Sequence, residues 1–303
     1  MMFSASIHGN LLRVLSQALA ITGLFMGQGA LSARPLFAVL ACLSLITFSG
    51  TSLAEHAKLI DVEVLTQQLS HEHGTQSQVN SIILAAEDSW PPFADQFGKG
   101  ISHQLVKSAF AEVGIRVETL VVPYSRGLRM AERGNVDGVF NVTREVSTQD
   151  KFIFGQQPLF QASASFYQHK SHPISAKSKY DLAPKAVIGV IKGYEYGDEF
   201  PQLVKQKDWV LFIANNQMQL INMLLVNRID LAVMFDAVAK EQLTQMGVNE
   251  EIQPIFNNHQ SDIFVAFSKQ QPNSSLLAKK LDEGLIKLKS QGQYAKLLLP
   301  LKN

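Results

Sequence analysis

The sequence contains very little cysteine. Its single cysteine, Cys42, lies inside the apolar run of residues 36–49. One cysteine cannot form a disulfide within the chain. We interpret the apolar run as the core of a removable export signal, as argued below, so the mature chain would have neither a disulfide nor thiol chemistry.

Charge is also scarce and nearly balanced. Charged residues make up 17% of the chain, and the formal net charge is +1. This composition lacks the excess of positive charge with which proteins bind nucleic acid or anionic membranes. Hydrophobic residues make up 46%, which is enough to bury a substantial core. The composition therefore favours a small neutral or modestly charged solute as the partner, and it does not favour nucleic acid.

Residues 1–54 have the features of an export signal. The apolar run of residues 36–49 has the length of a signal-peptide core and is short for a bilayer span. Small residues at Ser52 and Ala54 occupy the positions that a signal peptidase reads. We expect cleavage after Ala54 and a periplasmic location, with translation beginning at Met1 or at Met26. The alternatives are an uncleaved anchor formed by residues 14–33 and a lipoprotein site at Cys42.

Two histidine-containing segments are interpreted as solvated connections. Residues 55–80 form an N-terminal extension and linker, with a short helix expected at 58–69, and they include His71-Glu72-His73. His169-Lys170-Ser171-His172 precedes Pro173, which marks a connection between lobes. Neither segment has matching ligands at the spacing of known metal sites, so no metal is expected.

Apolar runs and helical periodicity alternate along the rest of the chain, which favours an α/β architecture. Strands are expected at 82–86, 117–122, 137–142, 161–168, 187–191, 209–213, 230–235 and 262–267. Helices are expected at 101–113, 125–133, 195–205, 216–226 and between 274 and 299. We assign residues 81–170 to a first lobe, 171–258 to a second lobe, and 259–303 to a return into the first.

One helix-to-strand turn is repeated in the two lobes. Gly134 precedes the strand at 137–142, and Asn227 precedes the strand at 230–235. Both residue types tolerate the left-handed conformation that ends a helix. Asp137 and Asp230 follow them, and we interpret both as turn residues that bind nearby backbone amides. The repetition predicts two lobes of similar construction.

Polar and aromatic residues follow three strands of the first lobe. The carboxyl ends of parallel strands meet at one edge of a sheet, and ligands bind where the strand order reverses. The candidates at this edge are Glu87, Asp88, Trp90, Phe93, Tyr124, Arg126, Asn141 and Arg144.

These motifs resemble a known family over residue 81 to the end of the chain. The motifs that carry the resemblance are Trp90-Pro91-Pro92-Phe93 and residues 121–128, 134–137, 154–160, 187–193, 227–230 and 292–296. Together they are similar to the periplasmic solute-binding proteins of the bacterial extracellular solute-binding family 3 type. The resemblance implies a two-lobed α/β fold of the type II periplasmic binding protein kind, with two crossovers at a hinge and a ligand cleft between the lobes.

The sequence departs from this family in the expected cleft. Relatives that bind amino acids usually carry an arginine that grips the ligand α-carboxylate, and Thr148 stands at that position here. Arg126 and Arg144 are alternative cations, because the planar guanidinium suits a carboxylate. Each could equally form a surface salt bridge.

The second lobe departs from the family as well. Relatives often place Gly-Thr or Gly-Ser where this chain has Gly193-Tyr194-Glu195, and their amides cup an anion at a helix start. Glu195 at a helix start would disfavour a ligand carboxylate. Tyr194 would either cover an apolar part of a ligand or pack in the core. Asp236 stands where relatives hold a ligand ammonium group, and its alternative role is a helix cap.

The resemblance implies capture of a small polar organic solute, an amino acid or related compound, for an inner-membrane ABC permease. We expect a monomer with no cofactor and no reaction. One alternative is an enzyme resembling cyclohexadienyl dehydratases, for which Glu87 and Asp88 are the candidate general acids. The other alternative is a ligand-sensing partner of a membrane kinase.

Processing provides the first test. Because the apolar run is short and is followed by small residues, the exported protein should begin at Glu55 and appear in a periplasmic extract. Amino-terminal sequencing of that protein checks the cleavage site. Membrane-bound protein that retains Met1 or Met26 would show instead that the segment is an anchor.

Overall fold

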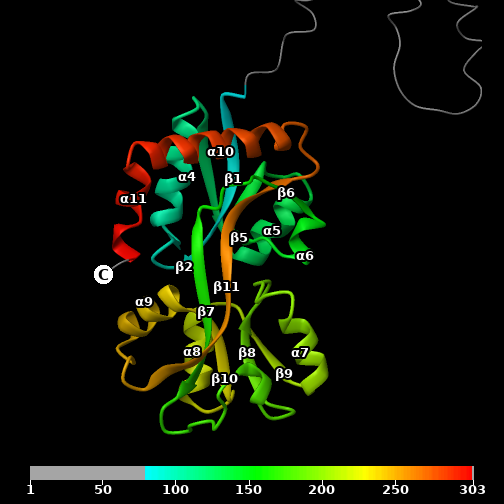
Figure 1. The fold of residues 1–303 in the computed structure, drawn as a ribbon, viewed down its shortest axis with the longest axis vertical. Helices are drawn as coiled ribbons and strands as arrows, with labels where there is room; N and C mark the ends of the chain where they lie inside the picture. Colours follow the sequence, from blue (N-terminus) through cyan, green and yellow to red (C-terminus); the bar gives the residue numbers. More distant parts are fainter. Residues whose placement is uncertain (1–78, 302–303) are drawn as a thin grey trace, which may run out of the picture. The chain divides into compact units, whose positions relative to one another are not determined.

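The computed structural model describes residues 79–301. The expected export signal, its cleavage site, the helix at 58–69 and His71-Glu72-His73 lie outside these residues. The described residues form two lobes joined by two long strands, as Figure 1 shows. Within residues 79–301, no helix is long and apolar enough to cross a membrane.

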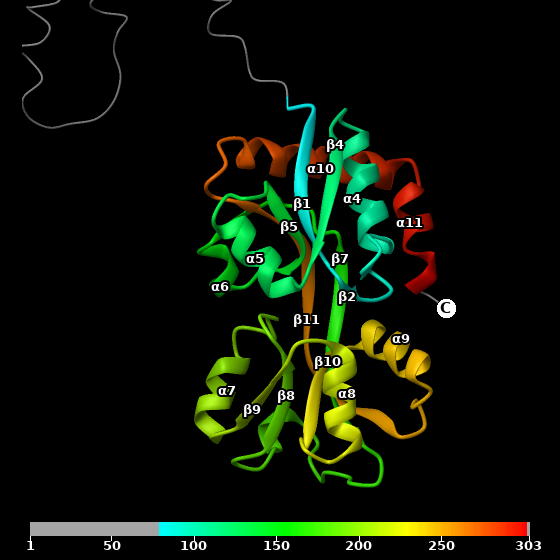
Figure 2. The ribbon, with the colours of Figure 1, turned by 180° about the vertical axis from the view of Figure 1, so that it is seen from behind.

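The first lobe is built around a sheet with helices on both sides. Its elements in chain order are β1 (Ser81–Glu87), β2 (Ser89–Trp90), β3 (Ala94–Asp95), α4 (Ile101–Ala111), β4 (Arg116–Val122), α5 (Tyr124–Glu132), β5 (Gly138–Thr143), α6 (Val146–Gln149) and β6 (Phe152–Phe154). The chain returns to it with α10 (Ser274–Ser290), α11 (Gln293–Leu297) and the short 3₁₀ helix η2 (Leu299–Leu301). Helices α4, α10 and α11 lie together on one side, and α5 lies on the other (Figure 2).

The second lobe repeats this plan with a smaller sheet. Its elements are the 3₁₀ helix η1 (Lys179–Asp181), β8 (Val187–Ile191), α7 (Phe200–Lys207), β9 (Val210–Ala214), α8 (Gln217–Leu225), β10 (Leu231–Phe235) and α9 (Asp236–Met246). Helix α7 lies on one side of this sheet, and α8 and α9 lie on the other (Figure 2).

Two antiparallel strands, β7 (Phe160–His169) and β11 (Ile252–Ser268), run through both lobes. They place the two lobe sheets in one strand order, β4-β1-β5-β11-β7-β10-β8-β9, with β6 also paired to β11. The end of β11 pairs with β5, while residues 164–167 of β7 pair with β10. The change from one lobe to the other therefore falls inside β7 and β11. The first boundary expected from the sequence, after residue 170, lies just beyond β7, and the second, after residue 258, lies inside β11.

The repeated turn has the same geometry in both lobes. Gly134 and Asn227 have positive φ angles of 76° and 54°. The Asp137 carboxylate accepts the backbone N–H of Ile83 at 2.7 Å, and the Asp230 carboxylate accepts that of Val187 at 2.7 Å. Each aspartate thus ties its turn to the parallel strand beside it. Both are turn residues, as predicted, but the amides that they bind belong to a neighbouring strand and not to their own turn.

Two differences from the sequence-based elements lie in the second lobe: α9 was not predicted, and α7 begins later than expected. A helix was predicted at 195–205, but α7 begins only at Phe200. The prediction was wrong for residues 195–199 because their hydrogen bonds go to other segments. The Tyr196 hydroxyl accepts the backbone N–H of Ile191 at 2.8 Å, and the Gly197 N–H binds Glu145 in the first lobe.

The turn aspartates can be tested separately from the binding site. Replacing Asp137 or Asp230 with Ala should each lower the free energy of unfolding by about 1 to 2 kcal/mol, because a strand N–H loses its acceptor. Replacement with Asn retains an oxygen acceptor and should lose much less. Chemical denaturation measures both. Equal losses for Ala and Asn would show that the charge matters and the hydrogen bond does not.

Candidate functional site

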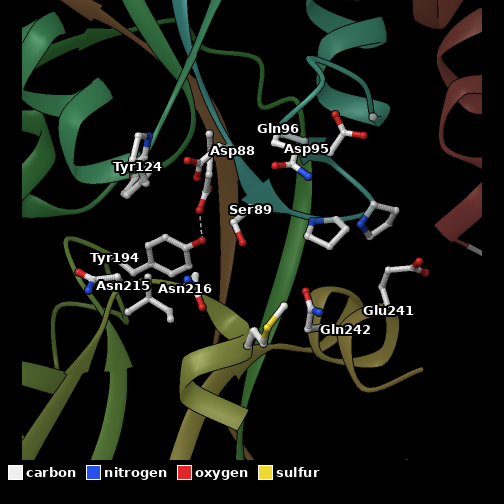
Figure 3. A pocket seen from close by; sticks show the side chains of 18 of the residues that line it. Asp88, Ser89, Asp95, Gln96, Tyr124, Tyr194, Asn215, Asn216, Glu241 and Gln242 are labelled. Carbon is white, nitrogen blue, oxygen red and sulfur yellow. Dashed lines mark hydrogen bonds between the residues drawn. The ribbon is translucent and has the colours of Figure 1, made fainter. Parts of the chain in front are cut away.

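Two cavities lie at the junction of the lobes. The larger is a cleft of about 810 Å³ between them. Figure 3 shows Asp88 and Ser89 of the first lobe above this cleft and Asn215, Asn216 and Gln242 of the second lobe below it. The smaller, which we call the inner cavity, has a volume of about 10 Å³. It is lined by Glu87, Trp90, Tyr124, Asn141, Thr143, Tyr194, Glu195 and Phe235.

The inner cavity is formed where strands of both lobes end. Glu87 ends β1, Tyr124 opens the helix that follows β4, and Thr143 ends β5. From the second lobe, Tyr194 and Glu195 lie in the turn after β8, and Phe235 ends β10. The cavity therefore sits at the carboxyl ends of the strands, where open α/β sheets bind ligands. Glu87, Tyr124 and Tyr194 line both cavities, so the two share walls.

Two of the hydrogen bonds between the lobes form a reciprocal pair, in which a tyrosine of each lobe donates to a glutamate of the other. The Tyr194 hydroxyl of the second lobe donates to Glu87 of the first (Figure 3). The Tyr124 hydroxyl of the first lobe donates to Glu195 of the second at 2.8 Å. The tyrosine rings meet edge to face, with centroids 5.1 Å apart. Each lobe thus contributes one glutamate and one tyrosine to what we call the crossed Glu–Tyr pairs.

Two further contacts hold the lobes together beside these pairs. The Glu145 carboxyl of the first lobe accepts the backbone N–H of Gly197 at 2.8 Å. In return, the Asp198 carboxylate of the second lobe accepts the N–H of Val146 at 3.0 Å. The lobes are therefore in contact across the inner cavity, while the larger cleft beside it stays open.

Burial controls the charge of the glutamates. Burial is the main cause that raises the pKa of Glu87 to about 8, and the nearby acids Asp88 and Glu195 raise it further. The hydrogen bond from Tyr194 acts in the opposite direction. Burial also raises the pKa of Glu195 to about 7, with Glu145 adding to the shift. Both side chains therefore hold a proton over part of the neutral pH range.

Two polar side chains at the inner cavity lack partners. Both amide atoms of Asn141 are buried without a hydrogen bond, and so is the indole Nε1 of Trp90. Asn141 is only 5% exposed, and Trp90 is 1% exposed. Asn141 also has a φ angle of 68°, which is uncommon for a residue other than glycine. Unpaired buried polar groups are costly, so this strained asparagine is a candidate functional position.

The profile of the bacterial extracellular solute-binding proteins, family 3, matches residues 82–299. The chain belongs to this family. None of the curated proteins matches the sequence.

Several solved structures have the same fold as this family 3 protein. An ancestral arginine-binding protein bound to arginine is 22% identical and covers 72% of this chain and 96% of its own, with a TM-score of 0.63. A histidine kinase sensor domain similar to periplasmic binding proteins is 19% identical and covers 72% and 94%, with a TM-score of 0.62. An amino acid ABC transporter substrate-binding protein from Streptococcus pneumoniae, bound to L-arginine, is 22% identical and covers 72% and 93%, with a TM-score of 0.59. These likenesses show the two-lobed fold of type II periplasmic binding proteins.

The structure assigns Thr148 a structural role at the position expected for the family arginine. Thr148 is 4% exposed and belongs to α6. Its hydroxyl accepts the N–H of Glu145 at 2.9 Å and lies 2.8 Å from the Thr143 carbonyl oxygen, to which it donates. This arrangement is a capping box, which pairs the otherwise free amides at a helix start. It also fixes Glu145 for its contact with the second lobe.

The structure brings only some of the predicted site residues together. Glu87, Asp88, Trp90, Tyr124, Asn141 and Tyr194 line the larger cleft, the inner cavity or both. Phe93 instead stacks on Phe160 in the first-lobe core, with centroids 4.5 Å apart. The role of these residues in binding stays a prediction.

The three charged residues predicted to hold the ligand, Arg126, Arg144 and Asp236, do not line either cavity. Arg126 and Arg144 are exposed and line neither of the two cavities described above. The Arg144 guanidinium lies 5.9 Å from the ring centre of Phe154 and donates weakly to the Gly155 carbonyl. Asp236 is half-buried at the start of α9, where its carboxylate accepts the Tyr167 hydroxyl at 2.9 Å.

Sequence reasoning missed several residues that line the cavities. Asn215 and Asn216 follow β9 directly, so the rule that strand ends form the cleft would have found them in the second lobe. Phe235 ends β10 and would have been found in the same way. Gln242 lies within α9, and no local pattern in the sequence distinguishes it.

Because the closed form raises the pKa values of Glu87 and Glu195, we expect its stability to depend on pH. A carboxyl whose pKa is raised in the closed form stabilises that form at low pH, and the contribution is lost as pH rises through the raised pKa. One pKa unit corresponds to about 1.4 kcal/mol, so the crossed Glu–Tyr pairs can shift closure by several kcal/mol. The loss begins above the ordinary carboxyl pKa of 4.5 and is complete near pH 8, so the radius of gyration of the ligand-free protein, measured by small-angle scattering, should increase over this range.

A double variant provides the control. Glu87→Gln with Glu195→Gln retains an acceptor for each tyrosine and removes both titrating groups. Its radius of gyration should not change over the same pH range. A wild-type protein that stays equally compact at high pH would contradict this account of closure.

Proposed function

We propose that this protein captures a small polar organic solute, an amino acid or related compound, in the periplasm and delivers it to an inner-membrane ABC permease. The solute enters the cleft between the lobes, and the lobes close over it by bending at β7 and β11. Hinge closure of this kind is the usual motion of two-lobed binding proteins. The protein acts as a monomer and needs no cofactor.

The observation that carries this proposal is that both lobes contribute to one site. Glu87, Tyr124 and Asn141 come from the first lobe, and Tyr194 and Glu195 come from the second. A solute in contact with all of them has differential affinity for the closed form, which is the condition for a ligand to shift a conformational equilibrium. The cleft of about 810 Å³ lies within the usual size range of small-molecule sites.

A thermal-shift screen of the mature protein tests this function. The screen uses amino acids, aliphatic amines, organic acids and aromatic metabolites. A solute present at about a thousand times its dissociation constant should stabilise the protein by roughly 4 kcal/mol. Small-angle scattering with the best solute at pH 9, where the ligand-free form is expected to be open, should then show compaction without a change in mass. A screen in which no solute stabilises the protein would count against solute capture.

An enzyme on the same scaffold is the second candidate. Glu87 favours it, because a carboxyl with a pKa of about 8 that faces a cavity holds a proton at neutral pH, as a general acid must. Analysis of the screened mixtures by mass spectrometry distinguishes the two functions. Conversion of a solute that Glu87→Gln abolishes would favour the enzyme, and a stable bound solute favours capture.

A further inference from the structure

The inner cavity contains acids and aromatic rings and no base. Glu87 and Glu195 enter it from opposite lobes, and none of its lining residues is lysine, arginine or histidine. Trp90 and Phe235 provide aromatic walls, with centroids 5.3 Å apart and planes at 87°. Acidic oxygens beside aromatic faces form an environment that attracts a cation.

Asn141 indicates independently that a ligand belongs here. Its side chain is buried at the inner cavity with neither amide atom paired, as described above. A buried asparagine with free donors and a free acceptor is costly unless another molecule supplies the partners. Its carbonyl oxygen adds a neutral acceptor to the two glutamate side chains.

The size of the inner cavity restricts the group that fits. Its volume of about 10 Å³ is close to that needed for one water molecule. A primary ammonium group is of similar size and donates three hydrogen bonds. Glu87, Glu195 and the Asn141 carbonyl can accept these hydrogen bonds, and the hydroxyl oxygens of Tyr124, Thr143 and Tyr194 line the same cavity. The rest of such a solute would extend into the larger cleft, which shares walls with the inner cavity.

We propose that the inner cavity binds the protonated primary amine of the solute, and that the solute has no carboxylate next to that amine. This inference rests on the proposed function and specifies its solute class. In an α-amino acid, the carboxylate is attached to the same carbon as the ammonium group, so it would enter a cavity with two glutamates and no cation. Lys99 and Lys192 are exposed residues that line only the larger cleft.

The protonation of the glutamates provides a specific test of the proposal, because binding should change the number of protons that they hold. Each glutamate faces acids and hydroxyls: Glu87 faces Tyr194, Asp88 and Glu195, and Glu195 faces Tyr124, Thr143 and Glu145. An ammonium group favours the ionised carboxylates, so its binding should release protons at pH 7. Binding of an anion by the same groups would take protons up.

Isothermal titration calorimetry on the exported protein, purified from a periplasmic extract, tests this class of solute. The probes are two matched pairs, putrescine with ornithine and agmatine with arginine, in which the amino acid differs by its α-carboxylate. Each amine should bind at least about tenfold more tightly than its partner, because a buried unpaired charge is costly. Titration of putrescine in buffers of different ionisation enthalpy should show proton release.

Three variants test the residues. Glu87→Gln and Glu195→Gln should each weaken putrescine binding by roughly 10- to 100-fold, because a charged partner is lost while the tyrosine contacts remain. Asn141→Gly should also weaken binding, and its melting temperature should not fall because glycine accepts the positive φ. Glu283→Gln removes an exposed carboxylate on α10 and should bind as the wild type does. Melting temperatures establish that each variant folds.

The outcomes separate this inference from the proposed function. If the amino acids bind as tightly as the amines, if putrescine binding takes protons up, or if both glutamine variants retain wild-type affinity, the inference is wrong. A neutral or acidic solute that binds while putrescine and agmatine do not also overturns it, and solute capture then stands. If no solute in the whole screen binds, the proposed function fails as well.

Discussion

The closed arrangement depends on two glutamates buried between the lobes without a cation. Moving a carboxylate out of water costs several kcal/mol unless it is paired, and a group without a pair keeps its proton instead. Here Glu87 and Glu195 each receive a tyrosine hydroxyl from the opposite lobe, and burial raises the pKa of both. Closure and protonation are therefore linked. Opening the lobes would return both carboxyls to water and lower their pKa values towards the ordinary range.

Much of the fold could be predicted from the sequence because its strands are local apolar runs. The strand expected at 187–191 has the same bounds in the structure, since β8 is Val187–Ile191. The turn at Gly134 and Asn227 was recognisable because few residue types tolerate a positive φ. The segment before α7 was not predictable in this way. Its conformation depends on Glu145 and Ile191, which lie elsewhere in the sequence.

The sequence could predict which strand ends form the candidate site, but not which of their side chains point into it. Tyr124 and Arg126 are two residues apart on one helix, which places their side chains about 200° apart around its axis. When Tyr124 faces the cavity, Arg126 faces solvent. On β5 the regular alternation is interrupted at Asn141, which has a positive φ and lies at a register shift, and both Asn141 and Thr143 line the cavity. Arg144 comes next and lies against Phe154. A strand end therefore identifies the neighbourhood, whereas helix periodicity and a local irregularity of β5 decide which residues enter the cavity.

Thr148, at the position expected for the family arginine, connects the cap of α6 with the charge of the buried glutamates. In relatives that bind amino acids, the resemblance implies a permanent cation there, which matches a ligand carboxylate. In this chain Thr148 instead completes the cap of α6, and that cap holds Glu145 against Gly197 of the second lobe. An added cation beside Glu145 and Glu195 would stabilise their ionised forms, so the closed form would no longer depend on protons. Without it, Glu87 and Glu195 hold protons over part of the neutral pH range, and the proposed ammonium group of the solute would supply the missing positive charge. On the inference above, the absence of an arginine at position 148 would both disfavour a ligand carboxylate and make the charge balance of the site depend on the solute.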